Sequence, residues 1–309
     1  MRVTVLAGGT GAAKFVRGLV KVVPAADITV IVNTGDDLEW WGLHVSPDLD
    51  TICYELAGLL DAERGWGRRE ETFHCRDTMA AMGEPAWFSV GDRDLSTHLF
   101  RTSQLRAGIT LSGITAELCR RWAIRTRVLP ATDNRLRTIV TMDDGEVGFQ
   151  EFFVRRRHQG AVHAVRFDGA DAASPAPGVL ASIAEAEVVV IAPSNPVTSV
   201  GPILAIPGLA GALAATRARV TAISPVIGST AFSGPADRLM KMRGLQSSAA
   251  GVAEAYRCFL NVLVADEQDR PIKDAIEGAG AKAFFTNIRM RDAGDSERLA
   301  RETIHADPL

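Results

Sequence analysis

The stretch RVTVLAGGTG, from Arg2 to Gly11, decides the fold that we predict for this chain. It opens with a short β-branched run and closes on glycines, a pattern typical of a buried strand that enters a tight turn. Residues 12–23 then carry apolar side chains at helical spacing, and ITVIV at 28–32 indicates a second strand. Strand, glycine turn, helix and strand begin a parallel βαβ unit, which binds ligands at the carboxyl ends of its strands.

The α/β pattern returns in the second half of the chain. Apolar runs that end in turn residues alternate there with segments of helical spacing. We predict strands over 187–192, 219–223, 261–265 and 283–286, and helices within 202–216 and 249–259.

Residues 62–165 have a different composition, with frequent arginines, few long β-branched runs and three of the five tryptophans. We expect a helix over 115–122 and a strand pair formed by 137–142 and 148–154. The whole pattern predicts an α/β fold: a Rossmann-like, three-layer, mostly parallel sheet with an inserted, more irregular α/β substrate lobe. In this division, residues 1–61 and 166–309 form the nucleotide-binding core, and 62–165 form the inserted acceptor-binding and dimer-contact lobe.

Charge and cysteine content argue against several classes of protein. The chain has 34 Lys and Arg against 37 Asp and Glu, a net charge of −3, whereas nucleic-acid binders usually carry a basic excess. Its four cysteines are scattered without a CxxC pair, which disfavours a metal–thiolate or redox-pair site. The N-terminal segment does not resemble a signal peptide, and no apolar run of about 20 residues predicts a membrane span. We therefore expect a cytoplasmic protein that binds neither nucleic acid nor membrane.

The glycine loop offers a site for phosphate. Gly8, Gly9, Thr10 and Gly11 let the backbone approach an anion, and the helix that follows adds free N–H groups and a partial positive charge. A plain tight turn is the alternative. The loop is not a P-loop, because no Gly-Lys-Ser/Thr follows it, and Lys14 stands where the dinucleotide fingerprint has its third glycine. This lysine either reaches a phosphate or is an exposed helix residue.

Four carboxylates lie within 15 residues after the second predicted strand: Asp36, Asp37, Asp48 and Asp50. The last two belong to PDLDT, at the start of an expected helix that runs to residue 60. Carboxylates hold Mg²⁺ against phosphate oxygens, and one of them can accept a proton from an attacking hydroxyl. The alternative for each is an ordinary capping or turn carboxylate.

Further polar segments fall at expected ligand edges. GDRD at 91–94 precedes His98, and Arg93 suits an anion through its guanidinium fork, although a surface turn would look the same. The loops SNP at 194–196 and SPVIG at 224–228 each follow a predicted apolar strand. Both loops therefore belong at the same sheet edge as the glycine loop.

These motifs together resemble the 2-phospho-L-lactate transferase family of coenzyme F420 biosynthesis, from residue 1 to about residue 270. Each motif is short, but eight in this order are specific, while the last 40 or so residues carry no usable motif. The chain ends at Leu309, which predicts a stand-alone transferase. The eight motifs are GGTG at 8–11, NTGDD at 33–37, SPDLDT at 46–51, GDRD at 91–94, LPATD at 129–133, FQEFF at 149–153, APSNP at 192–196 and SPVIG at 224–228.

The resemblance implies a transfer reaction at phosphorus. The donor is a guanosine diphosphate ester that carries 2-phospholactate, phosphoenolpyruvate or 3-phosphoglycerate. The acceptor is the ribityl hydroxyl of the deazaflavin Fo, and GMP leaves. Mg²⁺ is the implied cofactor, and the implied assembly is a homodimer. Transfer of this kind depends mostly on positioning and charge stabilisation, which a glycine loop and carboxylates supply.

The resemblance also assigns roles to positions of this chain. Asp50, Arg93 and Asp94 are assigned to Fo, Asp50 and Asp48 are the catalytic candidates, and Asp50 as general base is a hypothesis. The predicted Mg²⁺ ligands are Asp36, Asp37 and Asp48. The nucleotide is assigned to Gly8, Gly9, Thr10, Gly11, Lys14, Asn33, Ser194, Asn195 and Gly228.

Two other functions match part of the pattern. A nucleotide-sugar-binding regulatory protein of the related gluconeogenesis-factor type shares the glycine-loop fold, but PDLDT and GDRD favour the transferase. An NAD-dependent oxidoreductase needs an acidic residue where the second strand ends, and Asn33 stands there instead.

Overall fold

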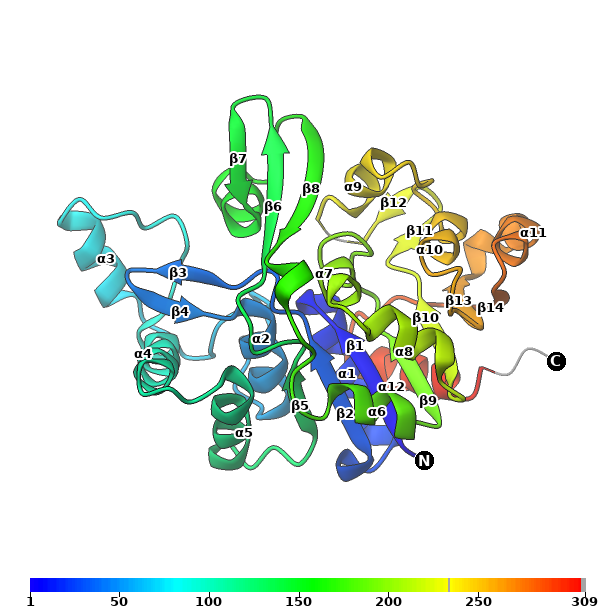
Figure 1. Ribbon diagram of the computed structural model, residues 1–309, viewed down its shortest axis with the longest axis horizontal. Coiled ribbons are helices and arrows are strands. Elements are labelled where there is room, and N and C mark those ends of the chain that lie inside the picture. The colour runs from blue at the N-terminus through cyan, green and yellow to red at the C-terminus, as the bar shows by residue number, and fades with distance from the viewer. Residues whose placement is uncertain (233, 307–309) are drawn as a thin grey trace.

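A seven-stranded parallel sheet forms the centre of the protein. The computed structural model describes residues 1–232 and 234–306. The strand order is β14-β13-β10-β9-β1-β2-β5, and every pair in it is parallel (Figure 1). The predicted α/β fold with a mostly parallel sheet is therefore confirmed. The strands are β1 (Val3–Ala7), β2 (Ile28–Val32), β5 (Arg127–Pro130), β9 (Val188–Ile191), β10 (Arg219–Ile223), β13 (Val262–Asp266) and β14 (Lys282–Thr286).

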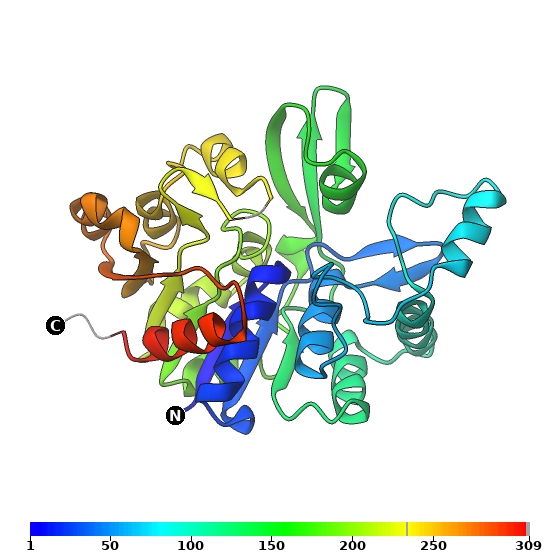
Figure 2. The same cartoon turned by 180° about the vertical axis from the view of Figure 1, so that it is seen from behind.

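Helices cover both faces of this sheet and produce three layers. Because side chains alternate along a strand, Val3 and Val5 of β1 belong to one apolar core and Leu6 to the other. Figures 1 and 2 show the two faces in turn. One core is covered by α1 (Gly9–Val22), α2 (Pro47–Leu56), α5 (Leu111–Arg121) and α12 (Ala293–Ile304), the other by α6 (Val179–Glu185), α7 (Gly201–Ala205), α8 (Leu209–Ala215), α9 (Ala236–Met242) and α10 (Ala249–Ala255).

The C-terminal helix α12 packs closely against α1, which lies in front of the sheet in Figure 2. A Cβ added at Gly18 would lie 2.1 Å from the carbonyl oxygen of Ser296, so only glycine allows this approach. Arg17 also donates a hydrogen bond of 3.3 Å to the Ser296 hydroxyl. α12, which lies in the part of the sequence without a recognisable motif, therefore completes the layer that supports the glycine loop.

The remaining elements project from the carboxyl end of the sheet. Two form an antiparallel hairpin and three a small antiparallel sheet, which stands above the main sheet in Figure 1. They are β3 (Leu38–Trp40) with β4 (Leu43–Val45), and β6 (Arg137–Met142) with β7 (Gly145–Gly148) and β8 (Val162–Asp168). The short pair β11 (Val226–Ile227) and β12 (Thr230–Ala231) and the helices α3 (His74–Ala81) and α4 (Asp92–Arg106) complete the set. The helix α11 (Lys273–Gly278) instead packs against α10 and β14.

Two predictions about the region 62–165 need correction. The segment 148–154 is not a strand: β7 ends at Gly148, and Glu151–Arg155 form one π-helical turn. The reason is packing, because Phe149 and Phe152 both enter the apolar core. Residues three apart on a strand point to opposite faces, whereas on a helical turn they share one face. Moreover β5, which lies inside 62–165, is a strand of the main sheet, so the predicted insertion is interrupted by a core element.

The helix that starts at Pro47 ends earlier than predicted. It stops at Leu56 rather than near residue 60. Gly58 adopts a φ of +66°, a left-handed conformation that favours glycine, and the amide of Leu59 turns back to the carbonyl of Tyr54.

Candidate active site

The sheet reverses its strand order between β1 and β9. From β1 the chain adds β2 and β5 on one side, and β9, β10, β13 and β14 on the other. Open α/β sheets bind ligands at such a switch point, outside the carboxyl ends of the strands. The loop after β1 is the glycine loop, and the loop after β9 contains Ser194 and Asn195. The two loops that the sequence assigned to the nucleotide therefore meet at this point.

Close backbone contacts join these two loops. The Ser194 hydroxyl donates a hydrogen bond of 2.8 Å to the Gly8 carbonyl. A Cβ added at Gly11 would lie 2.4 Å from the carbonyl oxygen of Pro193, so a side chain there would push the loops apart. Gly9 has a φ of +76°, which only glycine adopts readily. Gly9 and Gly11 are thus needed for the shape of the loop.

Asp48 connects the glycine loop to the loop after β2. Its Oδ1 accepts from the Gly9 amide at 2.8 Å, and its Oδ2 accepts from the Asn33 side-chain amide at 2.9 Å. The side-chain oxygen of Asn33, Oδ1, in turn accepts from the Gly35 amide at 2.8 Å. Asp48 lies in the first turn of α2, where the positive end of the helix dipole favours an anionic side chain.

The other residues assigned to the nucleotide lie nearer the surface or form local contacts. Thr10 and Lys14 are exposed on the first turns of α1. Asn195 accepts from the amide of Val197 within its own loop. Gly228 has a φ of +59°, and its amide donates to Asp269.

Three carboxyl groups of the loop after β2 and of the first turn of α2 have raised pKa values. Burial raises the pKa of Asp36 well above its ordinary value, and the nearby charge of Asp48 raises it further. Burial also raises the pKa of Asp37, against the effect of His44. Burial raises the pKa of Asp48 to about 6, although the Asn33 and Gly9 hydrogen bonds lower it. These groups favour either a proton or a cation beside them.

The three predicted metal ligands do not converge as a set. No three His, Cys, Asp or Glu side chains of residues 1–232 and 234–306 are grouped to hold a metal ion by themselves. The reason is that Asp37 turns away: its Oδ2 lies 3.0 Å from His44 Nε2 and accepts from the Ser46 hydroxyl at 2.8 Å. Asp36 Oδ1 is buried with no hydrogen-bond partner in the described chain. Mg²⁺ usually needs only one or two carboxylates, with waters and phosphate oxygens completing its shell, so Asp36 and Asp48 fit such a partial site.

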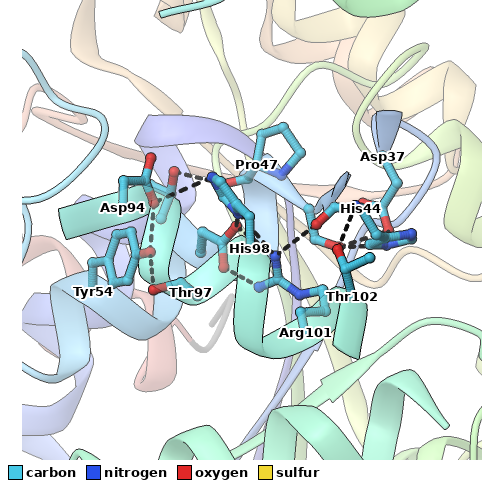
Figure 3. Close-up of polar contacts among 12 residues, drawn as sticks. Asp37, His44, Pro47, Tyr54, Asp94, Thr97, His98, Arg101 and Thr102 are labelled. Carbon is cyan, nitrogen blue, oxygen red and sulfur yellow. Dashed lines mark hydrogen bonds and ion pairs between the residues drawn. The ribbon is translucent and has the colours of Figure 1, made fainter. Parts of the chain in front are cut away.

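Asp50 belongs to a buried network between α2 and α4, of which His98 and Arg101 are labelled in Figure 3. Arg101 Nη2 donates to Asp50 Oδ1, and Arg101 Nη1 donates to Asp50 Oδ2 at 3.1 Å. The imidazole of His98 lies between Asp50 and Asp94, with nitrogen–oxygen distances of 3.7 and 3.5 Å. Burial lowers the pKa of Arg101, but the charge and hydrogen bonds of Asp50 outweigh it and raise the pKa overall. Asp50 is therefore held as one half of an ion pair.

The residues predicted to contact the acceptor take different positions. The Tyr54 hydroxyl donates to Asp94 Oδ1 at 2.6 Å, which ties Asp94 to the network of Asp50. Arg93 instead extends to the surface and pairs with Glu70 at 2.9 Å. The structure thus joins Asp50 with Asp94 and places the Arg93 side chain outside their hydrogen-bond network.

Sequence reasoning missed Arg101. The signal was present, because Asp94, His98 and Arg101 occupy positions i, i+4 and i+7 of α4 and so share one helix face. All three side chains are buried, which polar residues on a surface helix would not be. Polar residues at helical spacing in this segment were a detectable sign of a buried polar face.

A cavity of about 200 Å³ opens beside Asp36. It lies between the β3–β4 hairpin and the start of β6 with the residues after β7, and Asp36, Trp40, Trp87, Arg137, Thr138 and Phe149 are among its lining residues. The rings of Trp40 and Trp87 meet edge to face with centroids 4.7 Å apart. The cavity thus combines aromatic walls with residues of β6.

The raised pKa of Asp48 predicts a specific pH dependence of stability. The folded protein holds the proton of Asp48 up to about pH 6, whereas the ordinary pKa is 3.8. The protonated Asp48 therefore contributes fully to the free energy of unfolding below pH 4, and this contribution is lost as the pH rises through 6. The free energy of unfolding of the wild type, minus that of Asp48→Asn, should fall by roughly 2–3 kcal/mol from pH 4 to pH 7. Urea unfolding of both proteins without metal or nucleotide measures this difference, and a constant or rising difference would contradict the assignment.

Comparison with known proteins gives one consistent result. A family model described as 2-phospho-L-lactate transferase CofD matches residues 3–304. Two proteins named phosphoenolpyruvate transferase, from Streptomyces avermitilis and Streptomyces coelicolor, are 46% and 45% identical to this chain. Each alignment spans 310 residues, 98% of this chain and 97% of the relative.

A solved structure supports the fold. A Bacillus halodurans protein described as a member of the UPF0052 family matches with a TM-score of 0.65 at 17% identity, over 98% of this chain and 99% of that chain. At this identity the likeness concerns the fold alone. No helix within residues 1–232 and 234–306 combines the length and the apolar character that a bilayer crossing requires.

Proposed function

Because this chain belongs to the 2-phospho-L-lactate transferase CofD family, we propose that it transfers a phospho-three-carbon-acid group to the ribityl hydroxyl of Fo in coenzyme F420 biosynthesis. The donor is the guanosine diphosphate ester of that acid, and GMP is released. The names of the most similar relatives favour phosphoenolpyruvate over 2-phospholactate and 3-phosphoglycerate as the acid. We also propose that the working protein is a cytoplasmic homodimer.

The observation that carries this proposal is the position of Asp48 at the switch point of the sheet. Asp48 binds the glycine loop through Gly9 and the loop after β2 through Asn33. A diphosphate on the glycine loop would lie at the N-terminus of α1, where free amides favour an anion. The carboxylates of Asp48 and Asp36 would then border the phosphates, and Mg²⁺ between them would supply charge neutralisation.

The reaction exchanges one bond at phosphorus for another. The hydroxyl oxygen of Fo forms a bond to the distal phosphorus, and the bond from that phosphorus to the bridging oxygen breaks. GMP leaves with the electron pair, and the hydroxyl proton passes to a carboxylate. Positioning and charge stabilisation account for most of the rate in such reactions. The amides of the glycine loop are therefore proposed to hold the diphosphate in line with the incoming hydroxyl.

Between the two catalytic candidates, Asp48 is the better proton acceptor. Both oxygens of Asp50 accept hydrogen bonds from Arg101 and are therefore already engaged by a cation. Without a bound cation, burial raises the pKa of Asp48 to about 6, close to the value that suits a base at neutral pH. We assign Asp50 to holding the acceptor side of the site in place, together with Asp94 and Arg93.

The nucleotide-sugar-binding regulator remains the second candidate, because it shares the glycine-loop fold. Family membership and the names of the relatives favour the transferase. A regulator would bind a nucleotide without forming a product from Fo.

One experiment tests the proposed function directly. Purified protein is incubated with Fo, Mg²⁺ and each of the three guanosine diphosphate esters in turn, and the products are identified by mass spectrometry. We expect GMP and the phosphodiester of Fo, formed fastest from the phosphoenolpyruvate ester. Binding of the esters without any product from Fo would favour the regulator.

A further inference from the structure

Arg137 is a half-buried cation without a partner among the described residues. It is the first residue of β6 and lines the cavity beside Asp36. Its guanidinium forms no hydrogen bond or ion pair with any residue in 1–232 or 234–306, and its Nη2 lies over Gly148, where an added Cβ would be 3.4 Å away. Asp168, which faces it on β8, is already paired with Arg135 and Arg166 at 3.2 and 3.0 Å. The five N–H donors of this arginine are therefore available to a ligand.

Other buried polar atoms of the same cavity also have no partner. They are Asp36 Oδ1, Asp37 Oδ1, Trp40 Nε1 and Thr138 Oγ1, each without a hydrogen bond to the described residues. Buried polar groups are normally satisfied, and an exception requires an explanation. These four atoms mark the lining of the cavity as polar.

The loop after β2 connects the proposed diphosphate site to the cavity. Asp48 accepts from the Gly9 amide and from the Asn33 side chain, and Asn33 Oδ1 accepts from the amide of Gly35, which lines the cavity. The loop that carries Asp36 is joined to β6, because the Thr138 amide donates to the Gly35 carbonyl at 2.6 Å. A donor whose diphosphate lies on the glycine loop would therefore extend its far end past Asp36 toward Arg137.

From this arrangement we propose that Arg137 binds the carboxylate of the three-carbon acid in the donor and so selects donors that carry an acid. The inference rests on the proposed function, because it takes the donor to be a guanosine diphosphate ester. A guanidinium matches a carboxylate with two parallel hydrogen bonds. A lysine would offer only a point charge at this position.

The size of the cavity agrees with a small group. Its volume of about 200 Å³ is below the roughly 300–1,000 Å³ of pockets that enclose a drug-sized ligand. A three-carbon acid is the smallest part of either substrate. The flat ring system of Fo is larger, so the cavity suits the acid better than the acceptor.

The acidic residues around the cavity do not prevent anion binding. Asp37 is engaged by His44 and Ser46. Glu151 pairs with Arg155 at 3.3 Å and with Arg156 at 3.6 Å. Glu39 is exposed to solvent. Arg137 is thus the cation of the lining whose charge is not already neutralised.

The test compares two guanosine diphosphate esters that differ only in the carboxylate, the ester of lactic acid and that of isopropanol. Their dissociation constants, together with that of GDP, are measured by calorimetry with Mg²⁺ for the wild type and Arg137→Gln. The wild type should bind the lactyl ester roughly 10- to 100-fold more tightly than the isopropyl ester, the range expected for a charged hydrogen-bonded pair. Arg137→Gln should lose this preference and keep its affinity for GDP and the isopropyl ester within about threefold.

Two further variants complete the design, and a melting curve of each variant checks that it is folded. Arg137→Lys should recover part of the preference, because it keeps the charge without the fork. Arg135→Gln, on the same segment but paired with Asp168 at the surface, should bind every ligand like the wild type. Equal affinity of the wild type for the two esters would overturn the role of Arg137. An equal loss of affinity for both esters in a folded Arg137→Gln protein would overturn it as well. Failure of the wild type to bind GDP or either ester would instead contradict the proposed function.

Discussion

Replacing Asp48 by asparagine is expected to lower kcat by at least about 100-fold while the protein stays folded. Asp48 accepts one hydrogen bond on each oxygen, from Gly9 and from Asn33. Asparagine has a single carbonyl oxygen, so one of these donors would face an amide N–H₂. The variant also loses the carboxylate that would accept the proton, and a general base contributes roughly 10²- to 10⁴-fold. Initial rates with saturating Fo and donor measure this effect.

The matched control is Asp50→Asn, which changes the same group two residues further along α2. If Asp48 accepts the proton, Asp50→Asn should act mainly through the KM for Fo and leave kcat less affected. Near-normal kcat in Asp48→Asn would contradict its role. A larger loss of kcat in Asp50→Asn than in Asp48→Asn would return the role of base to Asp50.

Replacing Arg101 by methionine is expected to destabilise the protein by about 3–5 kcal/mol, the usual cost of leaving one charge of a buried ion pair alone. Only 2% of the Arg101 side chain and 7% of the Asp50 side chain are exposed. Since domains are stable by roughly 5–15 kcal/mol, this loss is a large fraction of the total. Urea unfolding followed by circular dichroism measures it.

Two controls separate the ion pair from the loss of a long side chain. The double variant Arg101→Met with Asp50→Asn removes both charges and should recover much of the stability, because no unpaired charge remains. Arg166→Met breaks pairs of 2.8 and 3.0 Å at the surface and should cost less than about 1 kcal/mol. A double variant as unstable as the sum of its single variants would show that the pair does not act as a unit.

Much of the fold could be predicted from the sequence because its signals are local. The strand β2 coincides with the predicted 28–32, and β10 coincides with the predicted 219–223, since each is a short apolar run that ends in turn residues. The strand predicted over 148–154 was wrong, because the packing of Phe149 and Phe152 determines that segment and its local pattern does not.

The candidate site could be predicted in part. Loops that follow neighbouring parallel strands must meet at one sheet edge, so the meeting of the glycine loop with Ser194 followed from the strand pattern. The partners of the carboxylates could not be predicted in this way. Asp37 and Asp48 both follow β2, yet one turns to His44 and the other to Gly9.

The sequence by itself determined the parallel α/β core, the glycine loop at the end of β1 and the family resemblance, because these depend on residues close together in the chain. Only the tertiary structure decided which charges pair and which stay free. Arg101 reaches Asp50 across 51 residues, and Arg17 meets Ser296 across 279. Within the part of the chain that the structure describes, Arg137 has no partner, and Asp168 is paired with two other arginines. Such contacts depend on how the helices and the small sheet pack on the core, and no local sequence pattern encodes that packing.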